Sequence, residues 1–318
     1  MVERIKDAIT KARQERETQR QGTGSQPVSP PSAPTASPRT KPGTGTMSVG
    51  GSQAAQADTQ PGHAGDDRST GFHAVSQKSV AGAQWDDLTK IELDPKALEA
   101  NRVISHSKSD PAHVPVDILR TKLLKEIRSH GCKRVAITSP TAGCGKTFMA
   151  TNLACSLARQ PTLRTMLIDY DLRKPQVESY VGSTERKSLE RFLTGEEAVQ
   201  DYFFLAGQNL VLGLNSYPIK NSSELIHDEK TKSILSGAIE ALAPDVVILD
   251  LPPLLTTDDV LAFVSNVDCV ILVVAAGETT ADEIDECERQ LSKLTTFLGV
   301  VLNKCNTSSA DVYDYGYS

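Results

Sequence analysis

The chain has 318 residues, of which 39% are hydrophobic and 23% charged, and its formal net charge is −6. This length predicts one or two domains, the modest apolar fraction predicts that part of the chain is disordered, and the negative charge argues against nucleic acid as a partner. The longest apolar runs, such as 269–276, fall far short of the ~20 residues that span a bilayer, and the charged N-terminus lacks a signal-peptide core, so we expect a soluble protein.

Two N-terminal segments precede the part of the chain that is expected to fold. Residues 1–20 place apolar side chains at helical spacing among charges, which predicts a short amphipathic helix. Such a helix is barely stable alone, so it either frays or docks on a partner, and the sequence leaves both open. Residues 21–85 consist mainly of Pro, Gly, Ser, Thr, Gln and Ala, which bury too little apolar surface to offset their ordering entropy. We expect a disordered linker there.

Strand and helix patterns alternate through residues 86–306. Near-continuous apolar and β-branched runs predict strands that are covered on both faces, as in a parallel sheet. Stretches with helical spacing lie between most of them. The alternation predicts an α/β fold, a doubly wound and mostly parallel sheet with helices on both faces. The expected strands are 134–139, 165–169, 210–214, 246–250, 269–274 and 299–303, and the expected helices are 116–128, 146–159, 223–242 and 280–297.

A glycine-rich loop follows the first of these strands. The segment 139–147 reads S-P-T-A-G-C-G-K-T and runs into a helix, which is the setting of a phosphate-binding P-loop. In such a loop backbone N–H groups turn toward phosphate oxygens, Lys146 would reach the β- and γ-phosphates, and the Thr147 hydroxyl would bind Mg²⁺. Pro140 replaces the first glycine of the full motif, and G-x-G-K-T alone also fits an accidental turn. The predicted nucleotide-binding residues are Thr141, Ala142, Gly143, Cys144, Gly145, Lys146, Thr147 and Phe148.

Polar residues end other strands of the predicted sheet. Asp169 and Asp171 follow the second strand, and Asp250 ends the fourth. Because the carboxyl ends of parallel strands face one ligand crevice, we expect these carboxylates near the phosphates, where an Asp is a usual Mg²⁺ ligand. The alternatives are helix-capping aspartates in a solvated loop and a simple strand-terminating Asp. Asn303 and Lys304 end the last strand and either line the base pocket or form a turn.

The cysteines and histidines bear on metals and on the cellular compartment. The six cysteines are scattered through the chain and form no C-x-x-C pair. This pattern offers neither a disulfide framework nor a zinc site, and it is typical of a reducing cytoplasm. The six histidines lack metal-ligand spacing as well. A bound metal is therefore expected to have oxygen ligands.

Tyrosines gather at the C-terminus. Three of the seven, Tyr313, Tyr315 and Tyr317, lie in the last six residues of the chain. Their period-two spacing also fits an edge strand, but Asp and Gly disfavour strands and chain ends fray. Exposed tyrosines beside an ATP site are candidate phosphate acceptors. Each phosphate would add roughly −1.5 to −2 charges, so a phosphorylated tail should be expelled from an acidic, phosphate-filled site and act as a switch.

Together these motifs resemble the bacterial tyrosine autokinases of the P-loop type, the cytoplasmic kinases of capsule and exopolysaccharide export. The resemblance covers about residues 101–318 and rests on S-P-T-A-G-C-G-K-T, L-I-D-Y-D-L-R-K-P, I-L-D-L-P-P and the tyrosine tail. The stretches N-S-S-E-L and L-P-P-L-L-T-T-D-D-V-L-A-F are similar to the exopolysaccharide-locus branch. The resemblance implies a kinase domain over 86–306 and a tyrosine-rich tail over 307–318.

The resemblance also implies a role for each motif residue. Lys146 and Thr147 would hold ATP and Mg²⁺, and Asp171 and Asp250 would complete the metal site. Asp169 would accept or orient the tyrosine hydroxyl proton. The implied catalytic residues are Lys146, Asp169, Asp171 and Arg173, the nucleotide site adds Asn303 to the loop 141–148, and the implied phosphate acceptors are Tyr313, Tyr315 and Tyr317.

Partners follow from the same resemblance. In such families a separate membrane protein, a polysaccharide co-polymerase or chain-length regulator, supplies an activating cytoplasmic segment. The resemblance therefore implies a cytoplasmic kinase that is held at the inner face of the plasma membrane through this partner. It also implies a homo-oligomer, a cognate tyrosine phosphatase, and regulation of exopolysaccharide or capsule polymerisation and export.

Two positions depart from the family pattern. The E-x-x-R-x-x-R assembly motif on the helix before the P-loop aligns with Asp117, Arg120 and Leu123, so its second arginine is lost, which calls that assembly mode into question. Leu251 stands where a Ser or Thr often follows the third acidic residue, a change that we expect to be tolerated.

Two other functions fit the same fold. A partitioning or positioning ATPase of this superfamily would hydrolyse ATP without phosphorylating protein, but such proteins usually carry a lysine five residues before the P-loop lysine, where this chain has Thr141. A non-catalytic scaffold would bind nucleotide to gate assembly with a membrane partner. The presence of Lys146, Asp171 and Asp250 argues against the scaffold, and the tyrosine tail has no obvious purpose in an ATPase switch.

Overall fold

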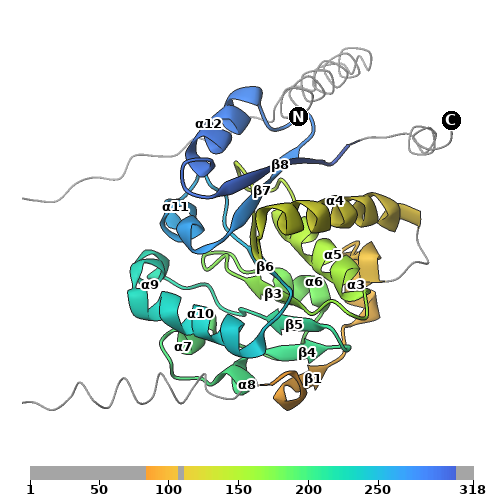
Figure 1. The fold of residues 1–318 in the computed structure, drawn as a ribbon, viewed down its shortest axis with the longest axis vertical. Coiled ribbons are helices and arrows are strands. Elements are labelled where there is room, and N and C mark those ends of the chain that lie inside the picture. Colours follow the sequence, from red (N-terminus) through yellow and green to blue (C-terminus); the bar gives the residue numbers. More distant parts are fainter. Residues whose placement is uncertain (1–83, 107–110, 306–318) are drawn as a thin grey trace, which may run out of the picture.

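The computed structural model describes residues 84–106 and 111–305. The predicted N-terminal helix, nearly all of the predicted linker and the tyrosine tail lie outside these ranges. Within them the chain forms one eight-stranded sheet with helices on both faces (Figure 1). The doubly wound α/β fold expected from the sequence is confirmed.

The sheet order is β1-β4-β5-β3-β6-β2-β7-β8. Neighbouring strands are parallel except for β4 and β5, which pair antiparallel. Strands β1 and β4 therefore run opposite to the rest of the sheet. The strand bounds are Thr89–Ile91 (β1), Arg134–Thr138 (β2), Thr165–Asp169 (β3), Phe204–Ala206 (β4), Leu210–Gly213 (β5), Val246–Asp250 (β6), Cys269–Ala275 (β7) and Thr296–Asn303 (β8).

Two hydrophobic cores cover the two faces of the sheet, because successive strand side chains point to opposite faces. In β6, Val246 and Ile248 belong to one core and Val247 and Leu249 to the other. The first core also receives side chains from α3 to α6, and the second from α7 to α12. The helices are Pro95–Ala100 (α3), Val114–His130 (α4), Lys146–Ala158 (α5), Val177–Val181 (α6), Leu189–Leu193 (α7), Val199–Tyr202 (α8), Ser222–His227 (α9), Glu229–Leu242 (α10), Asp259–Phe263 (α11) and Ala281–Leu291 (α12).

Two of the expected helices were wrong in extent. The single helix expected over 223–242 is two helices, α9 and α10, because Asp228 between them has an extended backbone (φ −69°, ψ 119°) and its side chain caps α10. The helix expected over 280–297 ends with α12, and Thr296 already lies in β8, opposite Cys269 of β7. In the first case a helix cap interrupts the expected helix, and in the second the last expected helical residues pair with a strand instead.

The topology brings three strand ends to one edge of the sheet. Strand β2 lies between β6 and β7, and β6 also pairs with β3. Asp169 at the end of β3 lies opposite Asp250 at the end of β6. The chain leaves β2 at the same edge, passes through the glycine-rich loop and enters α5. The predicted phosphate loop and the predicted carboxylates therefore meet at this edge.

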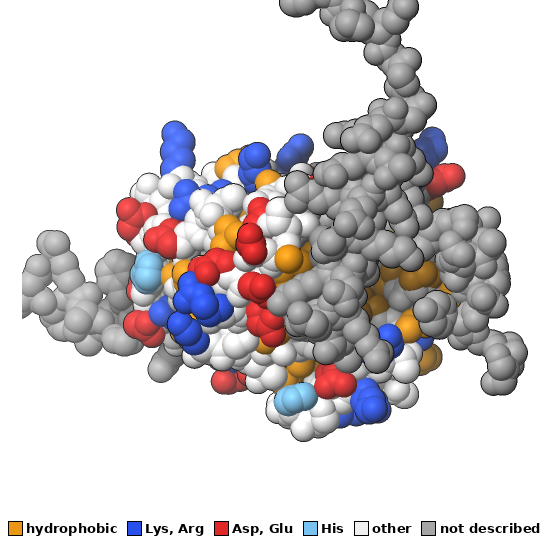
Figure 2. Space-filling model, turned by 90° about the horizontal axis from the view of Figure 1, so that it is seen from above, with side chains coloured by type: hydrophobic (Ala, Val, Ile, Leu, Met, Phe, Trp, Pro, Cys, Tyr) orange, Lys and Arg blue, Asp and Glu red, His pale blue; other side chains and the backbone are white. Residues whose placement is uncertain are grey.

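The surface carries charges of both signs. On the face shown in Figure 2, Lys and Arg side chains are interspersed with Asp and Glu. Hydrophobic side chains lie between them, and the most exposed large ones in the described ranges include Ile118 and Tyr217. Over residues 84–106 and 111–305, no helix combines the length and the apolar character needed to cross a membrane.

Trp85, placed by the sequence at the end of the linker, belongs to the fold. Its indole N–H donates a 2.6 Å hydrogen bond to the carbonyl of Leu242, the last residue of α10, and the Arg164 guanidinium lies over its ring.

We expect Trp85→Phe to lower the free energy of unfolding by about 1–2 kcal/mol, because the buried carbonyl loses its donor. Urea unfolding measures this. The exposed Tyr217 offers the control, and a Tyr217→Phe variant that loses as much would contradict the assignment.

Candidate active site

The glycine-rich loop has an open backbone cradle. Gly143 and Gly145 adopt left-handed backbone conformations (φ +87° and +93°), which residues other than glycine rarely adopt. Among the described residues, no acceptor pairs with the backbone N–H groups of 143–146. Several unpaired donors at the start of a helix form an anion site, since they and the helix dipole both favour negative charge. The loop is therefore suited to phosphate.

Strand β8 supports the loop from behind. The Asn303 side-chain amide donates a 2.9 Å hydrogen bond to the Cys144 carbonyl, and a side chain at Gly145 would collide with that amide. The Cys144 thiol lies 3.7 Å from the hydroxyls of Thr141 and Thr279. The structure thus places Asn303 against the loop backbone, and its role in the base pocket stays a prediction. Of the remaining loop residues, Ala142 is exposed and Phe148 packs against the core on the α5 side.

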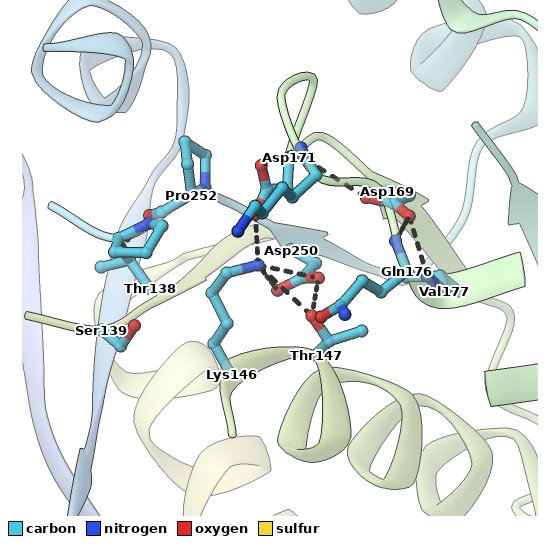
Figure 3. A network of polar contacts seen from close by, with 12 residues as sticks. Thr138, Ser139, Lys146, Thr147, Asp169, Asp171, Gln176, Val177, Asp250 and Pro252 are labelled. Carbon is cyan, nitrogen blue, oxygen red and sulfur yellow. Dashed lines mark hydrogen bonds and ion pairs between the residues drawn. The ribbon is translucent and has the colours of Figure 1, made fainter. Parts of the chain in front are cut away.

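Lys146 joins the loop to the carboxylates (Figure 3). Its ammonium lies 2.9 Å from Asp171 Oδ2 and 3.2 Å from Asp250 Oδ1. The Thr147 hydroxyl donates a 2.5 Å hydrogen bond to Asp250 Oδ2. All four side chains are buried, Lys146 with 8% of its surface exposed. Four residues that the sequence singled out on three separate segments therefore converge on one point.

Asp169 is close by but faces elsewhere. One of its carboxylate oxygens accepts hydrogen bonds from the backbone N–H groups of Gln176 and Val177, both at 2.8 Å, at the start of α6. The other accepts a 3.3 Å hydrogen bond from the backbone N–H of Asp171. Asp169 is fully buried and makes no direct contact with Lys146. Its observed task is to order the loop between β3 and α6.

The electrostatics of the site favour a cation. Burial opposes the charge of Lys146, but Asp250 and Asp171 outweigh it and raise the pKa of its ammonium. Burial raises the pKa of Asp250, which Lys146 and the Thr147 hydroxyl oppose, and burial together with Asp250 raises the pKa of Asp169 well above its usual range. Two buried carboxylates thus pair with Lys146 while a third, Asp169, lies nearby without contacting it, so ionised carboxylates outnumber the cation.

The residues fit Mg²⁺. In the described ranges no group of three or more His, Cys, Asp and Glu side chains is placed to hold a metal by itself. The hydroxyl of Thr147 and the carboxylates of Asp171 and Asp250 supply oxygen atoms, the ligands that Mg²⁺ prefers, and Mg²⁺ usually completes its shell with substrate phosphates and water. Bound Mg²⁺ would neutralise phosphate charge during transfer.

Arg173 does not join the cluster. Its guanidinium forks onto the buried carboxylate of Asp259 at the start of α11, with Nε–Oδ2 at 2.7 Å and Nη2–Oδ1 at 2.9 Å. The catalytic role that the resemblance implies for Arg173 stays a prediction. Asp259 is a polar centre that the sequence reasoning missed, and the two adjacent aspartates of L-P-P-L-L-T-T-D-D were its only signal.

The aligned assembly motif points into the molecule. Asp117 accepts hydrogen bonds from Arg120 (3.1 Å) and the Ser156 hydroxyl (2.5 Å), and it pairs with Arg159. Leu123 is buried in the core beneath α4. Asp117 therefore fastens α4 to α5. At the position of the motif's second arginine, Leu123 is instead a core side chain.

Asp169 provides a pH-dependent prediction. Its raised pKa means that ionisation disfavours the folded state, a cost that sets in above the ordinary pKa of 3.8 and is complete above the raised value. Asp169→Asn, which keeps an oxygen for the α6 N–H groups, is expected to raise the free energy of unfolding at pH 7, because it removes the cost of the buried charge. The gain should vanish below about pH 4. Thermal unfolding against pH measures it, with the exposed Asp201→Asn as control, and a pH-independent difference would refute the cause.

A glycine-rich loop between a parallel strand and a helix, with a Lys–Thr pair facing aspartates from two neighbouring strands, defines a P-loop nucleotide-binding domain. A family model described as an AAA domain matches residues 132–298, just over half of the chain. The chain is 31% identical over 189 residues to tyrosine-protein kinase CpsD of Streptococcus agalactiae, an alignment that covers 58% of this chain and 80% of CpsD. The protein belongs to the family of bacterial tyrosine-protein kinases.

Two further relatives define how far the likeness extends. The kinase domain of Escherichia coli tyrosine kinase ETK superposes with a TM-score of 0.57 at 25% identity, over 66% of this chain and 82% of that domain. EpsB of Ralstonia nicotianae is 28% identical over 214 residues, which is 65% of this chain and 27% of EpsB. The chain thus spans about a quarter of the length of this curated relative.

Proposed function

We propose that this protein is an ATP-dependent protein-tyrosine autokinase that phosphorylates Tyr313, Tyr315 and Tyr317 of its own tail. The observation that carries the proposal is the convergence of Lys146 and Thr147 with carboxylates from two strand ends. Phosphoryl transfer asks the protein mainly for positioning and charge neutralisation, and this cluster is built for both. The membership in the tyrosine-kinase family supports protein, rather than water, as the phosphate acceptor.

Each site residue has a task in this proposal. The loop 141–148 binds the triphosphate through its N–H groups, and Lys146 neutralises the β- and γ-phosphates. Thr147, Asp171 and Asp250 hold Mg²⁺, for which Lys146 must loosen its contacts with both carboxylates. Asn303 keeps the loop in place at the nucleotide, a role that its hydrogen bond to the Cys144 carbonyl supports. Different residues thus bind the nucleotide and hold the metal, so variants can affect one of the two functions without the other.

The acceptance of the tyrosine proton is a separate part of the proposal. The family resemblance assigns it to Asp169, but this carboxylate accepts hydrogen bonds from three backbone N–H groups. We assign Asp169 in the first place to ordering the loop that carries Asp171. If it also takes the proton, the tyrosine hydroxyl must reach Oδ1, which accepts only one of these three hydrogen bonds and keeps a second lone pair. Loss of phosphorylation in Asp169→Asn with normal MgATP binding would support the proton role.

The biological setting is proposed from the family resemblance. An N-terminal helix (1–20) and a linker (21–85) would precede the kinase domain (86–306) and the tail (307–318). The kinase would lie in the cytoplasm, reach the inner face of the plasma membrane through a polysaccharide co-polymerase, and form homo-oligomers. A tyrosine phosphatase would reverse the modification. The cycle would regulate exopolysaccharide or capsule polymerisation and export.

Phosphosite mapping by mass spectrometry tests the proposal. The full chain is incubated with MgATP, alone and with the cytoplasmic segment of the membrane partner. We expect phosphate on the three tail tyrosines and none after simultaneous replacement of Tyr313, Tyr315 and Tyr317 by phenylalanine. ATP hydrolysis without protein labelling in both incubations would instead identify an ATPase switch. Nucleotide binding with neither reaction would identify a scaffold.

A further inference from the structure

A buried carboxylate outside the proposed site gathers three donor side chains. Asp259, at the start of α11, is 1% exposed. Besides the two hydrogen bonds from Arg173, its oxygens accept hydrogen bonds from the hydroxyls of Ser222 (3.2 Å) and Ser223 (3.1 Å). Buried charges are costly unless they are paired and fully hydrogen-bonded, and this one is. The question is therefore which part of the chain this buried, hydrogen-bonded carboxylate holds in place.

The cluster fastens the segment that carries Asp171. Arg173 lies two residues beyond Asp171, between β3 and α6, whereas the serines begin α9 and Asp259 begins α11. Asp171 Oδ1 accepts a 3.0 Å hydrogen bond from the backbone N–H of Lys174, so its carboxylate is oriented by the same short segment that Arg173 anchors. A change in the position of Arg173 would therefore move Asp171.

Neighbouring contacts from the same two parts of the chain also hold this segment. The backbone N–H of Ile219 donates a 2.7 Å hydrogen bond to the Leu172 carbonyl. Tyr170 stacks on Phe263 of α11, with ring centroids 4.1 Å apart. Residues 170–173 are thus clamped between α11 and the chain that leads into α9. The bidentate Arg173–Asp259 pair is the charged member of this clamp, and such pairs fix geometry as well as add energy.

The ionisation of Asp259 suits a permanent clamp. Burial opposes its charge, but the hydrogen bonds and charge of Arg173 and the two serine hydroxyls outweigh burial and lower the pKa of Asp259 below its ordinary value. The carboxylate is therefore ionised throughout the neutral range. Asp259→Asn would keep the shape and lose the charge, and Arg173→Gln would remove the charge and the two-pronged contact of the guanidinium.

We propose that Asp259 is a positioning residue for the metal site: through Arg173 it fixes the segment 170–174 so that the Asp171 carboxylate points at the Mg²⁺ position. This inference rests on the proposed role of Asp171 as a Mg²⁺ ligand. The backbone N–H groups that would bind phosphate belong to the loop between β2 and α5, with which Arg173 and Asp259 form no hydrogen bond. Weakening the clamp should therefore lower Mg²⁺ affinity and leave Mg²⁺-free nucleotide binding intact.

The test measures nucleotide and metal binding in the full chain. A fluorescent ATP analogue is titrated first in EDTA and then with Mg²⁺, for Asp259→Asn, Arg173→Gln and the double variant. We expect each single variant to lose about tenfold in apparent Mg²⁺ affinity, as removal of an outer partner of a metal ligand does. Affinity in EDTA should stay within about twofold of wild type. Because both residues act through one pair, the double variant should lose no more than either single variant.

Several outcomes decide against the inference. Additive losses in the double variant, an equal loss in EDTA, or unchanged Mg²⁺ affinity would each overturn it. Arg173→Lys, which keeps the charge and one donor direction, should recover part of the affinity, which a purely structural role would not require. Arg191→Gln, on an exposed ion pair with Glu196, is the control and should match wild type.

Failure of the proposed function looks different. If wild type binds nucleotide without any Mg²⁺ dependence, the metal site itself is wrong, and the clamp has nothing to position. If wild type depends on Mg²⁺ and the variants behave like it, only the clamp is refuted. Thermal unfolding identifies any variant that fails to fold. Arg173, whose side chain is 43% exposed, then still provides a testable position through its Gln and Lys variants.

Discussion

Lys146→Met is expected to lower ATP-dependent tyrosine phosphorylation at least about a hundredfold, the scale of losing one preorganised charge at a reacting group. The methionine has a similar length but no charge, so the β- and γ-phosphates lose their neutralising partner. Quantitative phosphotyrosine mass spectrometry after incubation with MgATP measures the effect. Persistence of phosphotyrosine at the wild-type level would refute the kinase assignment and expose a contaminating kinase.

The same substitution also affects the folded state, and this must be separated from catalysis. Removal of Lys146 leaves Asp171 and Asp250 buried without their cation, and breaking one side of a buried pair commonly costs about 3–5 kcal/mol. Lys232→Met is the matched control, since Lys232 pairs with Glu229 on the surface of α10. Thermal unfolding of both variants shows whether lost phosphorylation occurs in a folded protein. A folded and inactive Lys146→Met variant is the expected result.

Phe192→Ala is expected to lower the free energy of unfolding by about 3–5 kcal/mol, the usual range for removing a buried aromatic ring. Phe192 of α7 is fully buried, with its ring stacked on Tyr202 (4.6 Å between centroids) and edge-on to Phe203 (5.2 Å). Urea unfolding measures the loss, and Phe192→Leu, which fills most of the space, should lose clearly less. Equal effects of the two substitutions would show that cavity formation is not the cause.

Much of the fold and of the site was predictable because the relevant signals are local. Strands β2, β3 and β6 are continuous apolar runs, so their ends lie within one residue of those expected, whereas β8 begins three residues before the expected strand. The loop 139–147 could be identified because glycines, lysine and threonine must follow one another in a phosphate loop. Parallel pairing then brings Asp169 and Asp250 to the same edge whatever the details of packing.

The remaining features depend on partners distant in the chain. Strands β1 and β4 have three residues each, and nothing in so short a run indicates a strand until the pairing partner is known. The contact between Arg173 and Asp259 joins residues 86 positions apart. The Asn303–Cys144 hydrogen bond spans 159 positions. Arginine, aspartate and asparagine side chains can form hydrogen bonds with many partners, so the residues next to them in the sequence do not predict which partner each one contacts.

The pairing of β1 with β4 has a consequence for how the domain can be divided. The matched family region begins at residue 132, yet the chain before it supplies the last strand of the sheet on that side. It also satisfies Asn152 of α5, whose amide accepts from the Ser105 N–H and donates to the Arg102 carbonyl. A protein that begins at residue 132 would lack β1 and would expose β4 as an open sheet edge, a template for pairing between molecules. Such a fragment should aggregate during expression, whereas one that begins before Gln84 should remain monodisperse.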